Sequence, residues 1–304
     1  MMTRRGFSQL MLAAGGAVPA LVAETGGWDE RLGVMCQLGS QESEAPRVLE
    51  AARQAGFRRV MVNFAWDRVN AGFLRSLPGW LRASELRCEA LGAYVNCVSP
   101  GTVLMSTRAE DFVRALSYAG ELGCRRLVAW TGSHVADLMQ ADPRNFNQES
   151  EDALVRFLEP HCARLSAARL TLCLESYITL TCPDAASLRR VLNRLPEFVT
   201  AVLDPPNLTP VARYSQRDEV LREMVRTLSG RIGIVHMKDF RLAAGGQAYE
   251  LPGPQMGEMN YPLFVELVRG LPEDIPVVAE HIGPSEFAAT RRKLLPLFVG
   301  AKHL

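Results

Sequence analysis

Short apolar runs recur along the chain and are its most regular feature. They are rich in Val, Ile and Leu, and they read RLGVMCQL, FRRVMVNF, CEALGAYVNC, CRRLVAWTG, LTLCLES, VTAVLDPPN, IGIVHMKDF and IPVVAEHIG (residues 31–38, 57–64, 88–97, 124–132, 170–176, 199–207, 232–240 and 275–283). Runs of this length and composition are typical of strands in a parallel sheet that is buried on both faces. The sequence therefore predicts eight such strands.

Helical periodicity fills the segments between these runs. The predicted helices cover residues 45–55, 109–122, 149–168, 185–195, 215–228, 261–269 and 284–298. Start and stop signals accompany several of them, such as Asp184 before the helix that begins at 185 and Gly56 after the helix that ends at 55. The stretch 72–84 is a weaker helix prediction because Pro78 and Gly79 interrupt it.

This alternation predicts an α/β fold, a closed (β/α)₈ TIM barrel in a single domain. The strand ends are separated by 26 residues (Gln37 to Asn63) to 45 residues (Trp130 to Glu175), so each interval has room for one helix and two loops. The 304 residues would also suffice for two average domains, but a barrel of this kind uses about 250 residues as one domain. An open doubly wound sheet is the alternative, and no G-x-G-x-x-G motif follows the first run to support it.

Composition and charge narrow the class of protein. The chain is 48% hydrophobic and 22% charged, as expected of a globular protein with a large core. Its 34 Lys and Arg nearly balance 33 Asp and Glu, so there is no overall basic field and we expect no nucleic acid partner. The seven cysteines show no C-x-x-C spacing and are interpreted as buried thiols, although one disulfide stays possible.

The N-terminal residues resemble a twin-arginine export signal. Arg4 and Arg5 precede a mildly apolar, Ala- and Gly-rich run over residues 10–23. We therefore interpret residues 1–26 as a signal that is removed and residues 27–304 as the barrel, and we expect the protein to be exported to the periplasm or secreted. The run is shorter than the roughly 20 residues that cross a bilayer as a helix. No membrane span is expected.

Metal-type side chains close four consecutive predicted strands, the fifth to the eighth. They are Glu175, Asp204, His236 and Glu280. In a (β/α)₈ barrel the C-terminal strand ends meet at one face, where catalytic side chains lie. Charges at the end of buried strands are costly unless a partner or a cation neutralises them. Three carboxylates and one imidazole suit one divalent cation, Mn²⁺ ahead of Mg²⁺, Co²⁺ or Zn²⁺.

The chain resembles the xylose isomerase-like barrel superfamily of sugar phosphate isomerases and epimerases over strands one to eight, most specifically in its second half. The resemblance is carried by the motifs LCLES, VLDPPN, IVHMKDF and VVAEH, together with GPQMGEMNYP at 253–262. Ketose 3-epimerases of this superfamily hold one divalent cation with Glu, Asp, His and Glu from strands five to eight, which match the four residues named above. The resemblance further implies that Glu175 and Glu280 act as acid and base on opposite sides of a sugar or polyol substrate.

Other residues are candidates for substrate binding. Trp130 and His134 follow the fourth strand, where a Trp can stack on a sugar and a His can bond a hydroxyl group, with ordinary loop packing as the alternative. Lys238 shares the side of His236 by alternation, and it can reach substrate oxygens or form a structural ion pair. Asn207 stands where ketose epimerases usually carry a second His, and Arg241 is offset by one residue from a substrate-binding Arg. The resemblance therefore implies the metal site but does not imply the substrate of the ketose epimerases.

The leading prediction is a metal-dependent isomerase or epimerase that transfers a proton through an enediolate. A lyase or dehydratase of a keto-sugar or keto-cyclitol, similar to inosose dehydratase, would use the same site. A DNA repair enzyme of the endonuclease IV type shares the barrel but needs many His ligands, and this chain has five His in all. A carbohydrate-binding barrel without catalytic activity is the remaining alternative.

Overall fold

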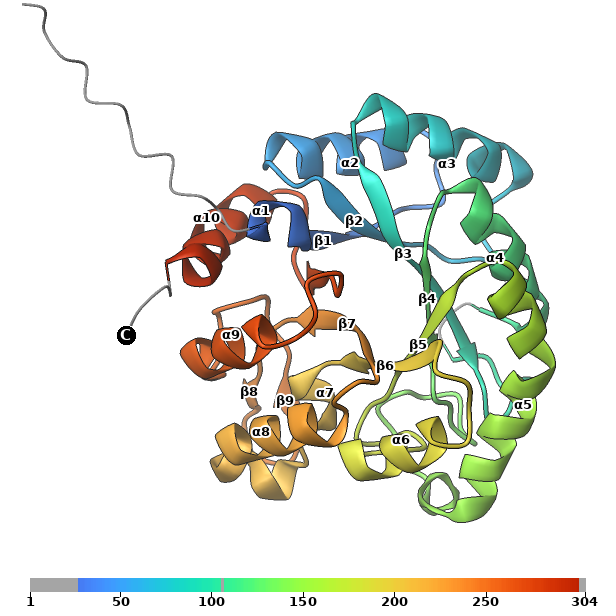
Figure 1. Cartoon of the computed structure of the whole chain (residues 1–304), viewed down its shortest axis with the longest axis vertical. Coiled ribbons are helices and arrows are strands. Elements are labelled where there is room, and N and C mark those ends of the chain that lie inside the picture. The colour runs from blue at the N-terminus through green and yellow to red at the C-terminus, as the bar shows by residue number, and fades with distance from the viewer. Residues whose placement is uncertain (1–26, 105–106, 301–304) are drawn as a thin grey trace, which may run out of the picture.

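A closed barrel of eight parallel strands forms the centre of the computed structural model (Figure 1), which describes residues 27–104 and 107–300. The proposed export signal lies outside these residues. The barrel strands are β1 (Leu32–Gln37), β2 (Arg59–Asn63), β3 (Arg87–Asn96), β4 (Arg126–Trp130), β5 (Thr171–Glu175), β6 (Val199–Leu203), β7 (Ile232–Met237) and β10 (Val277–Ala279). They neighbour one another in chain order, and β1 pairs with β10 to close the barrel. All eight predicted strands and the single TIM barrel are confirmed.

Helices surround the barrel on the outside (Figure 1). The longer ones are α2 (Ala45–Gln54), α3 (Ala71–Ala83), α4 (Ala109–Glu121), α5 (Gln148–Ala167), α6 (Ala185–Leu192), α8 (Arg217–Thr227), α9 (Tyr261–Arg269) and α10 (Phe287–Val299). Short elements complete the chain: α1 (Trp28–Arg31), α7 (Pro205–Leu208), the 3₁₀ helices η1 (Pro143–Phe146) and η2 (Val211–Gln216), and a hairpin of β8 (Arg241–Leu242) and β9 (Tyr249–Glu250). No helix in the described ranges has the length and apolar character to cross a bilayer.

Helix α3 forms although Pro78 lies inside it. The side chain of Asn70 caps its start by accepting a hydrogen bond from the backbone N–H of Phe73 at 2.9 Å. One face buries Phe73, Leu77 and Leu81. An internal proline costs about 3 kcal/mol, whereas burying each of these side chains contributes about 1.5–3 kcal/mol. Packing therefore outweighs the proline, and the weaker helix prediction proves to be a complete helix.

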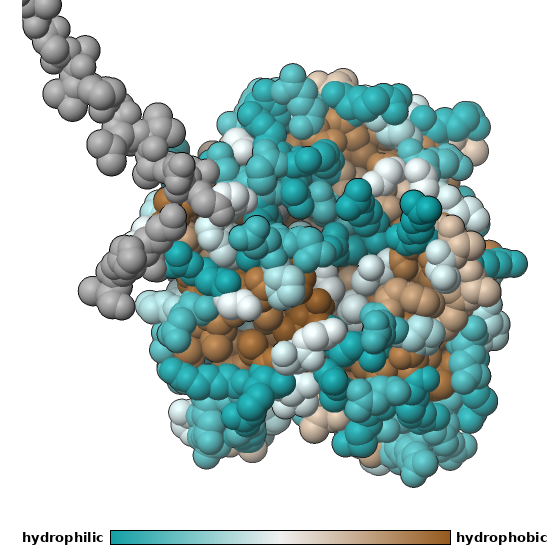
Figure 2. Space-filling model, viewed as in Figure 1, coloured by the Kyte–Doolittle hydropathy of each residue, from teal (hydrophilic) through white to brown (hydrophobic). Residues whose placement is uncertain are grey.

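Apolar side chains form two cores, one on each face of the closed sheet. The larger core lies between the strands and the helices. The smaller one fills the barrel and includes Met61, Ala90, Val128, Cys173, Val202, Ile234 and Val278. Because successive side chains of a strand point to opposite faces, every second residue of each run enters the barrel. On the face shown in Figure 2, hydrophobic side chains are seen mainly in recesses between hydrophilic ones.

Most of the cysteines are buried in these cores. All seven are free thiols, and six of them are buried (Cys36, Cys88, Cys97, Cys124, Cys173 and Cys182). Burial raises the pKa of thiols such as Cys36 and Cys97. They therefore behave as small apolar residues, as the sequence indicates, and no disulfide joins the described residues.

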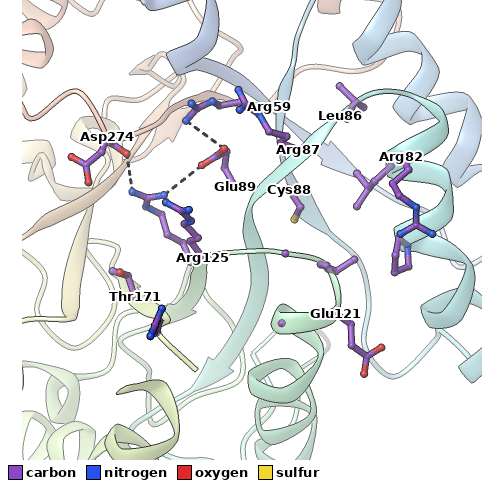
Figure 3. Close-up of a pocket in the computed structure, with 17 residues that line it drawn as sticks. Arg59, Arg82, Leu86, Arg87, Cys88, Glu89, Glu121, Arg125, Thr171 and Asp274 are labelled. Carbon is purple, nitrogen blue, oxygen red and sulfur yellow. Dashed lines mark hydrogen bonds and ion pairs between the residues drawn. The ribbon is translucent and has the colours of Figure 1, made fainter. Parts of the chain in front are cut away.

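An arginine–carboxylate cluster closes the N-terminal end of the barrel, beside a hollow of about 770 Å³ (Figure 3). Glu89 lies between Arg59, whose Nη1 is 3.3 Å from one carboxylate oxygen, and Arg126, whose Nη1 is 3.5 Å from the other. Arg126 also donates hydrogen bonds to the backbone carbonyls of Gly233 and Asp274, both at 2.8 Å. These contacts join strands from opposite sides of the barrel. We interpret this end as a structural closure, in keeping with the role of the N-terminal face in such barrels.

Glu89→Gln should destabilise the fold, because two largely buried guanidinium groups would lose their shared carboxylate. The side chains of Glu89 and Arg126 are only 13% and 10% exposed. We expect the free energy of unfolding to fall by roughly 1–3 kcal/mol, measured by denaturant unfolding. Glu85→Gln is the matched control, because Glu85 pairs with Arg53 at a site where it is 68% exposed. Equal effects of the two substitutions would contradict the proposed closure.

Candidate metal centre

The two-residue alternation of the strands brings the predicted metal ligands to one place. Each of the four follows a residue of the inner core by two positions, as Glu175 follows Cys173 and His236 follows Ile234. Strand pairing aligns them, because Leu203 is paired with Val235 and these residues immediately precede Asp204 and His236. The polar side chains therefore form the last layer inside the barrel, at the C-terminal ends of the strands.

Glu175, Asp204 and His236 form a buried group that can hold a metal ion. One ligand atom from each lies within 4.8 Å of those of the other two. Nδ1 of His236 is 3.2 Å from Oε2 of Glu175 and 3.5 Å from Oε2 of Glu280. Neither ring nitrogen of His236 makes a hydrogen bond of acceptable geometry with another described residue. A fully buried imidazole without partners is costly, so these nitrogens point to a ligand such as a cation.

Glu280 lies beside this group but is not part of it. Its Oε1 accepts a hydrogen bond from Nζ of Lys238 at 2.5 Å, and the same ammonium bonds Oδ2 of Asp204 at 2.5 Å. Lys238 is 2% exposed and therefore acts as a buried cation between two carboxylates. The structure thus brings together three of the four predicted ligands and holds the fourth against Lys238. It also places Lys238 in an ion pair at the site itself.

Neutral hydrogen-bond donors orient Glu175. The hydroxyl of Tyr94 donates to its Oε2 at 3.0 Å, and the amide of Asn207 donates to its Oε1 at 3.0 Å. Burial and the neighbouring carboxylates raise the pKa of Tyr94, which keeps its hydroxyl a donor. Asn207 is in turn placed by α7, whose start Asp204 caps. Both oxygens of Glu175 are therefore held in a fixed direction.

Burial and mutual charge set the protonation of the group. Burial raises the pKa of Asp204 to about 7, helped by the neighbouring carboxylates and opposed by Lys238. Burial alone would lower the pKa of His236, but Glu175 and Glu280 outweigh it and raise that pKa to about 9. Burial would likewise raise the pKa of Glu280, yet Lys238 and His236 lower it to about 2. The carboxylates also raise the pKa of Lys238, which stays charged.

A divalent cation fits the charge of this group. Three carboxylates against one ammonium leave two negative charges in a buried site, which is costly without compensation. One divalent ion next to a neutral imidazole would balance them. The oxygen and nitrogen donors of Glu175, Asp204 and His236 are those that Mn²⁺, Mg²⁺ and Zn²⁺ use in proteins. The residues present therefore fit the predicted cofactor.

A pocket of about 580 Å³ opens onto this group. Three predicted substrate-binding residues line it, namely Trp130, Asn207 and Lys238. The Trp130 ring packs against Tyr94 with 4.9 Å between the ring centroids. Glu175 and Glu280 also line the pocket, so both candidate catalytic carboxylates face the space that a substrate would enter.

Two predicted substrate-binding residues lie elsewhere. Nε2 of His134 is 2.8 Å from the hydroxyl of Ser150 at the start of α5, and the residue does not line the pocket. Arg241 is exposed on the hairpin strand β8, where its Nε donates to Glu250 at 2.7 Å. Both lie four residues beyond the end of a barrel strand, where strand alternation no longer fixes the direction of a side chain. Loop packing, the alternative for His134, describes it correctly.

Sequence reasoning missed five polar residues that line the pocket: Gln37, Asn63, Tyr94, Tyr177 and His281. Gln37 and Asn63 close β1 and β2, and their position two residues after Met35 and Met61 is the signal that could have found them. By alternation His281, which directly follows Glu280, would face away from the site. It reaches the pocket because its φ of 59° breaks the alternation directly after Glu280.

Solved structures share this fold. The IOLI protein with a bound zinc atom is 14% identical, with a TM-score of 0.64 over 90% of this chain and 99% of that chain. A D-psicose 3-epimerase solved in the presence of D-fructose is 13% identical, with a TM-score of 0.61 over 82% and 83%. An AP endonuclease, family 2, from Brucella melitensis is 16% identical, with a TM-score of 0.64 over 88% and 98%. Likeness at these identities shows the fold alone.

The family comparison goes further than the structural one. No curated protein sequence matches the chain. The model of the family described as xylose isomerase-like TIM barrel, however, matches residues 49–295. This match spans β2 to β10 and includes every residue of the candidate metal centre. The chain therefore belongs to the xylose isomerase-like TIM barrel family.

Proposed function

We propose that this protein is a divalent-metal-dependent isomerase or epimerase that acts on a sugar or polyol derivative. The observation that carries the proposal is the buried group of Glu175, Asp204 and His236, with Glu280 beside it. Neither nitrogen of His236 has a hydrogen-bond partner in the part of the chain that the structure describes. The D-psicose epimerase of similar fold supports the reaction class. Among the suitable ions we propose Mn²⁺, because the two carboxylates and one imidazole of the group, with the Glu280 carboxylate beside it, suit a cation between hard and borderline.

The two glutamates are the proposed proton carriers. Both carboxylates line the pocket, and both approach the same nitrogen of His236, so they meet at one point of the site. One would remove the proton next to a carbonyl or hydroxyl carbon, and the other would return a proton to the opposite face. A bound cation would supply electrostatic stabilisation to the two oxygens of the resulting enediolate. Lys238 holds Glu280 in place through its 2.5 Å hydrogen bond.

A nuclease of the endonuclease IV type is less well supported, although one structural relative carries the AP endonuclease name. Such enzymes use a trinuclear zinc centre with many His ligands. In the described part of the chain, His236 is the one histidine in the metal-type group. His134 bonds Ser150, and His161 packs against Phe112 with 5.2 Å between the ring centroids. These placements favour a single-ion site and a small-molecule substrate.

Metal binding should release protons, because the cation replaces protons held by His236 and Asp204. Their pKa values of about 9 and about 7 leave both groups at least partly protonated at neutral pH without metal. We expect roughly one and a half protons released at pH 7 and about one at pH 8. The raised pKa values also mean that metal affinity falls as the pH falls. Calorimetry with Mn²⁺ in buffers of different ionisation enthalpy measures the number directly, and release of no proton at pH 7 would contradict this assignment.

Proton transfer by Glu280 should be visible as exchange of a substrate proton with solvent. We expect the Mn²⁺-loaded protein to exchange the proton next to the carbonyl of a ketose in deuterated water, as followed by NMR. Glu280→Gln should slow this exchange by about 10²–10⁴-fold, because a proton carrier is lost while the side-chain shape is kept. Glu250→Gln is the matched control, since Glu250 pairs with Arg241 on the surface hairpin.

The same assay separates the alternative reaction. A lyase or dehydratase would also start with proton removal but would then eliminate water and create an ultraviolet chromophore. Appearance of that chromophore at the rate of proton exchange would replace the isomerase proposal by the dehydratase. A protein that binds no divalent ion, and whose ligand binding is unchanged by Glu175→Gln, would instead be the carbohydrate-binding barrel without catalytic activity.

A further inference from the structure

The pocket above the metal centre is divided into a polar floor and an apolar wall. The floor consists of the strand-end residues around Glu175 and Lys238. The wall consists of apolar side chains from strand β1 and from three loops, which are Met35, Leu138, Met139, Leu251 and Ile282. Three of these, Met35, Leu138 and Leu251, pack against the inner barrel core together with Trp130 and Tyr177. We call these five aliphatic side chains the apolar wall.

Backbone contacts hold the apolar wall in place. His281 has a φ of 59°, which is unfavourable for a residue other than glycine. Its Nδ1 lies 2.7 Å from the backbone carbonyl of Leu251, so the strained turn joins Leu251 to the neighbouring Ile282. The hydroxyl of Thr179 donates to the carbonyl of Leu138 at 2.5 Å. Strain of this kind persists where the surroundings enforce it, commonly at ligand sites.

Many polar groups of the pocket floor are engaged with one another. Lys238 bonds Asp204 and Glu280, and the amide of Asn207 bonds Glu175. The amide of Asn63 donates to Oε1 of Gln37 at 2.8 Å. A ketohexose has three hydroxyl groups beyond the carbonyl and its two flanking hydroxyls, and each needs a partner when water is removed. The floor can serve the reacting oxygens, and the indole N–H of Trp130, which has no hydrogen-bond partner among the described residues, can serve one further hydroxyl. The five side chains of the wall offer the other hydroxyl groups of such a sugar no partner.

We propose that the natural substrate joins a hydroxy-carbonyl head to an apolar alkyl or aryl group. The head reaches the metal centre, and the apolar group packs against the apolar wall. This inference rests on the proposed function for the identity of the head. Burial of apolar surface against the wall supplies the binding energy, because the wall offers no partner to hydroxyl groups. Met139, which is 53% exposed, has the exposure expected of a wall residue that an apolar group would cover.

The test compares ligands that share one head. The first is a ketohexose, and the second is the same six-carbon chain with hydrogen in place of the three distal hydroxyl groups. The third carries a phenyl ring at the distal end of that deoxygenated chain. Dissociation constants are measured by calorimetry on the Mn²⁺-loaded protein. We expect the second and third ligands to bind at least about tenfold more tightly than the ketohexose. Equal or tighter binding of the ketohexose would overturn the proposal.

Variants locate the effect on the wall. Leu251→Asn and Ile282→Asn should each weaken binding of the phenyl ligand by about tenfold and thereby reduce its preference over the ketohexose. Leu242→Asn is the matched control, because Leu242 is exposed on β8 and does not line the pocket. Met139→Ser tests the same wall at an exposed position where folding is not at risk. If Met139→Ser and Ile282→Asn both leave the selectivity intact, the wall does not determine it and the proposal fails.

Proton exchange separates this inference from the proposed function. Selective binding of the apolar ligands without any exchange of the proton next to their carbonyl would leave the ligand class standing and refute the isomerase. Exchange that is fastest with the ketohexose, with no gain from the apolar group, would support the isomerase and refute the ligand class.

Discussion

The burial of three carboxylates at one end of the barrel is the constraint on which the rest of the site depends. Glu175, Asp204 and Glu280 are each less than 5% exposed, and such a cluster is tolerable only with compensating positive charge. Lys238 provides one charge through hydrogen bonds to two of them. The raised pKa values of His236 and Asp204 show that, without a cation, protons supply the remainder. A divalent ion and protons on His236 and Asp204 are therefore alternative ways to balance the negative charge of these carboxylates.

The alternation of side chains that fills the barrel with apolar residues also directs the side chains of the metal site inward. Residues such as Val202, Ile234 and Val278 seal the interior with apolar side chains. Two residues further along each strand the inward position becomes charged, so the change from apolar to polar marks the end of the core. The apolar layer beneath removes water from below the carboxylates, which strengthens their mutual repulsion and their attraction for cations. Core packing and metal affinity are therefore coupled through strand register.

This coupling explains which parts of the site the sequence could predict. The eight runs and the strand-end positions of Glu175, Asp204 and His236 follow from periodicity, which a single sequence displays. The ion pairs of Lys238 depend on how its side chain meets the carboxylates that follow the neighbouring strands β6 and β10, and alternation indicates only the side to which Lys238 points. His134 and Arg241 lie beyond the ends of the barrel strands, where direction depends on contacts such as those with Ser150 and Glu250. The periodicity of apolar residues in a sequence does not indicate such contacts.

The two ends of the barrel show why only one of them suits a cation. At the N-terminal end two arginines share Glu89, which leaves an excess of positive charge in this cluster. At the C-terminal end Lys238 pairs with two of three buried carboxylates, which leaves an excess of negative charge and an imidazole without hydrogen-bond partners among the described residues. The first arrangement needs no added cation and stabilises the closure of strands. The second is incomplete without an added positive charge, and that deficit, rather than the size of either hollow, assigns the chemistry of this barrel to its C-terminal face.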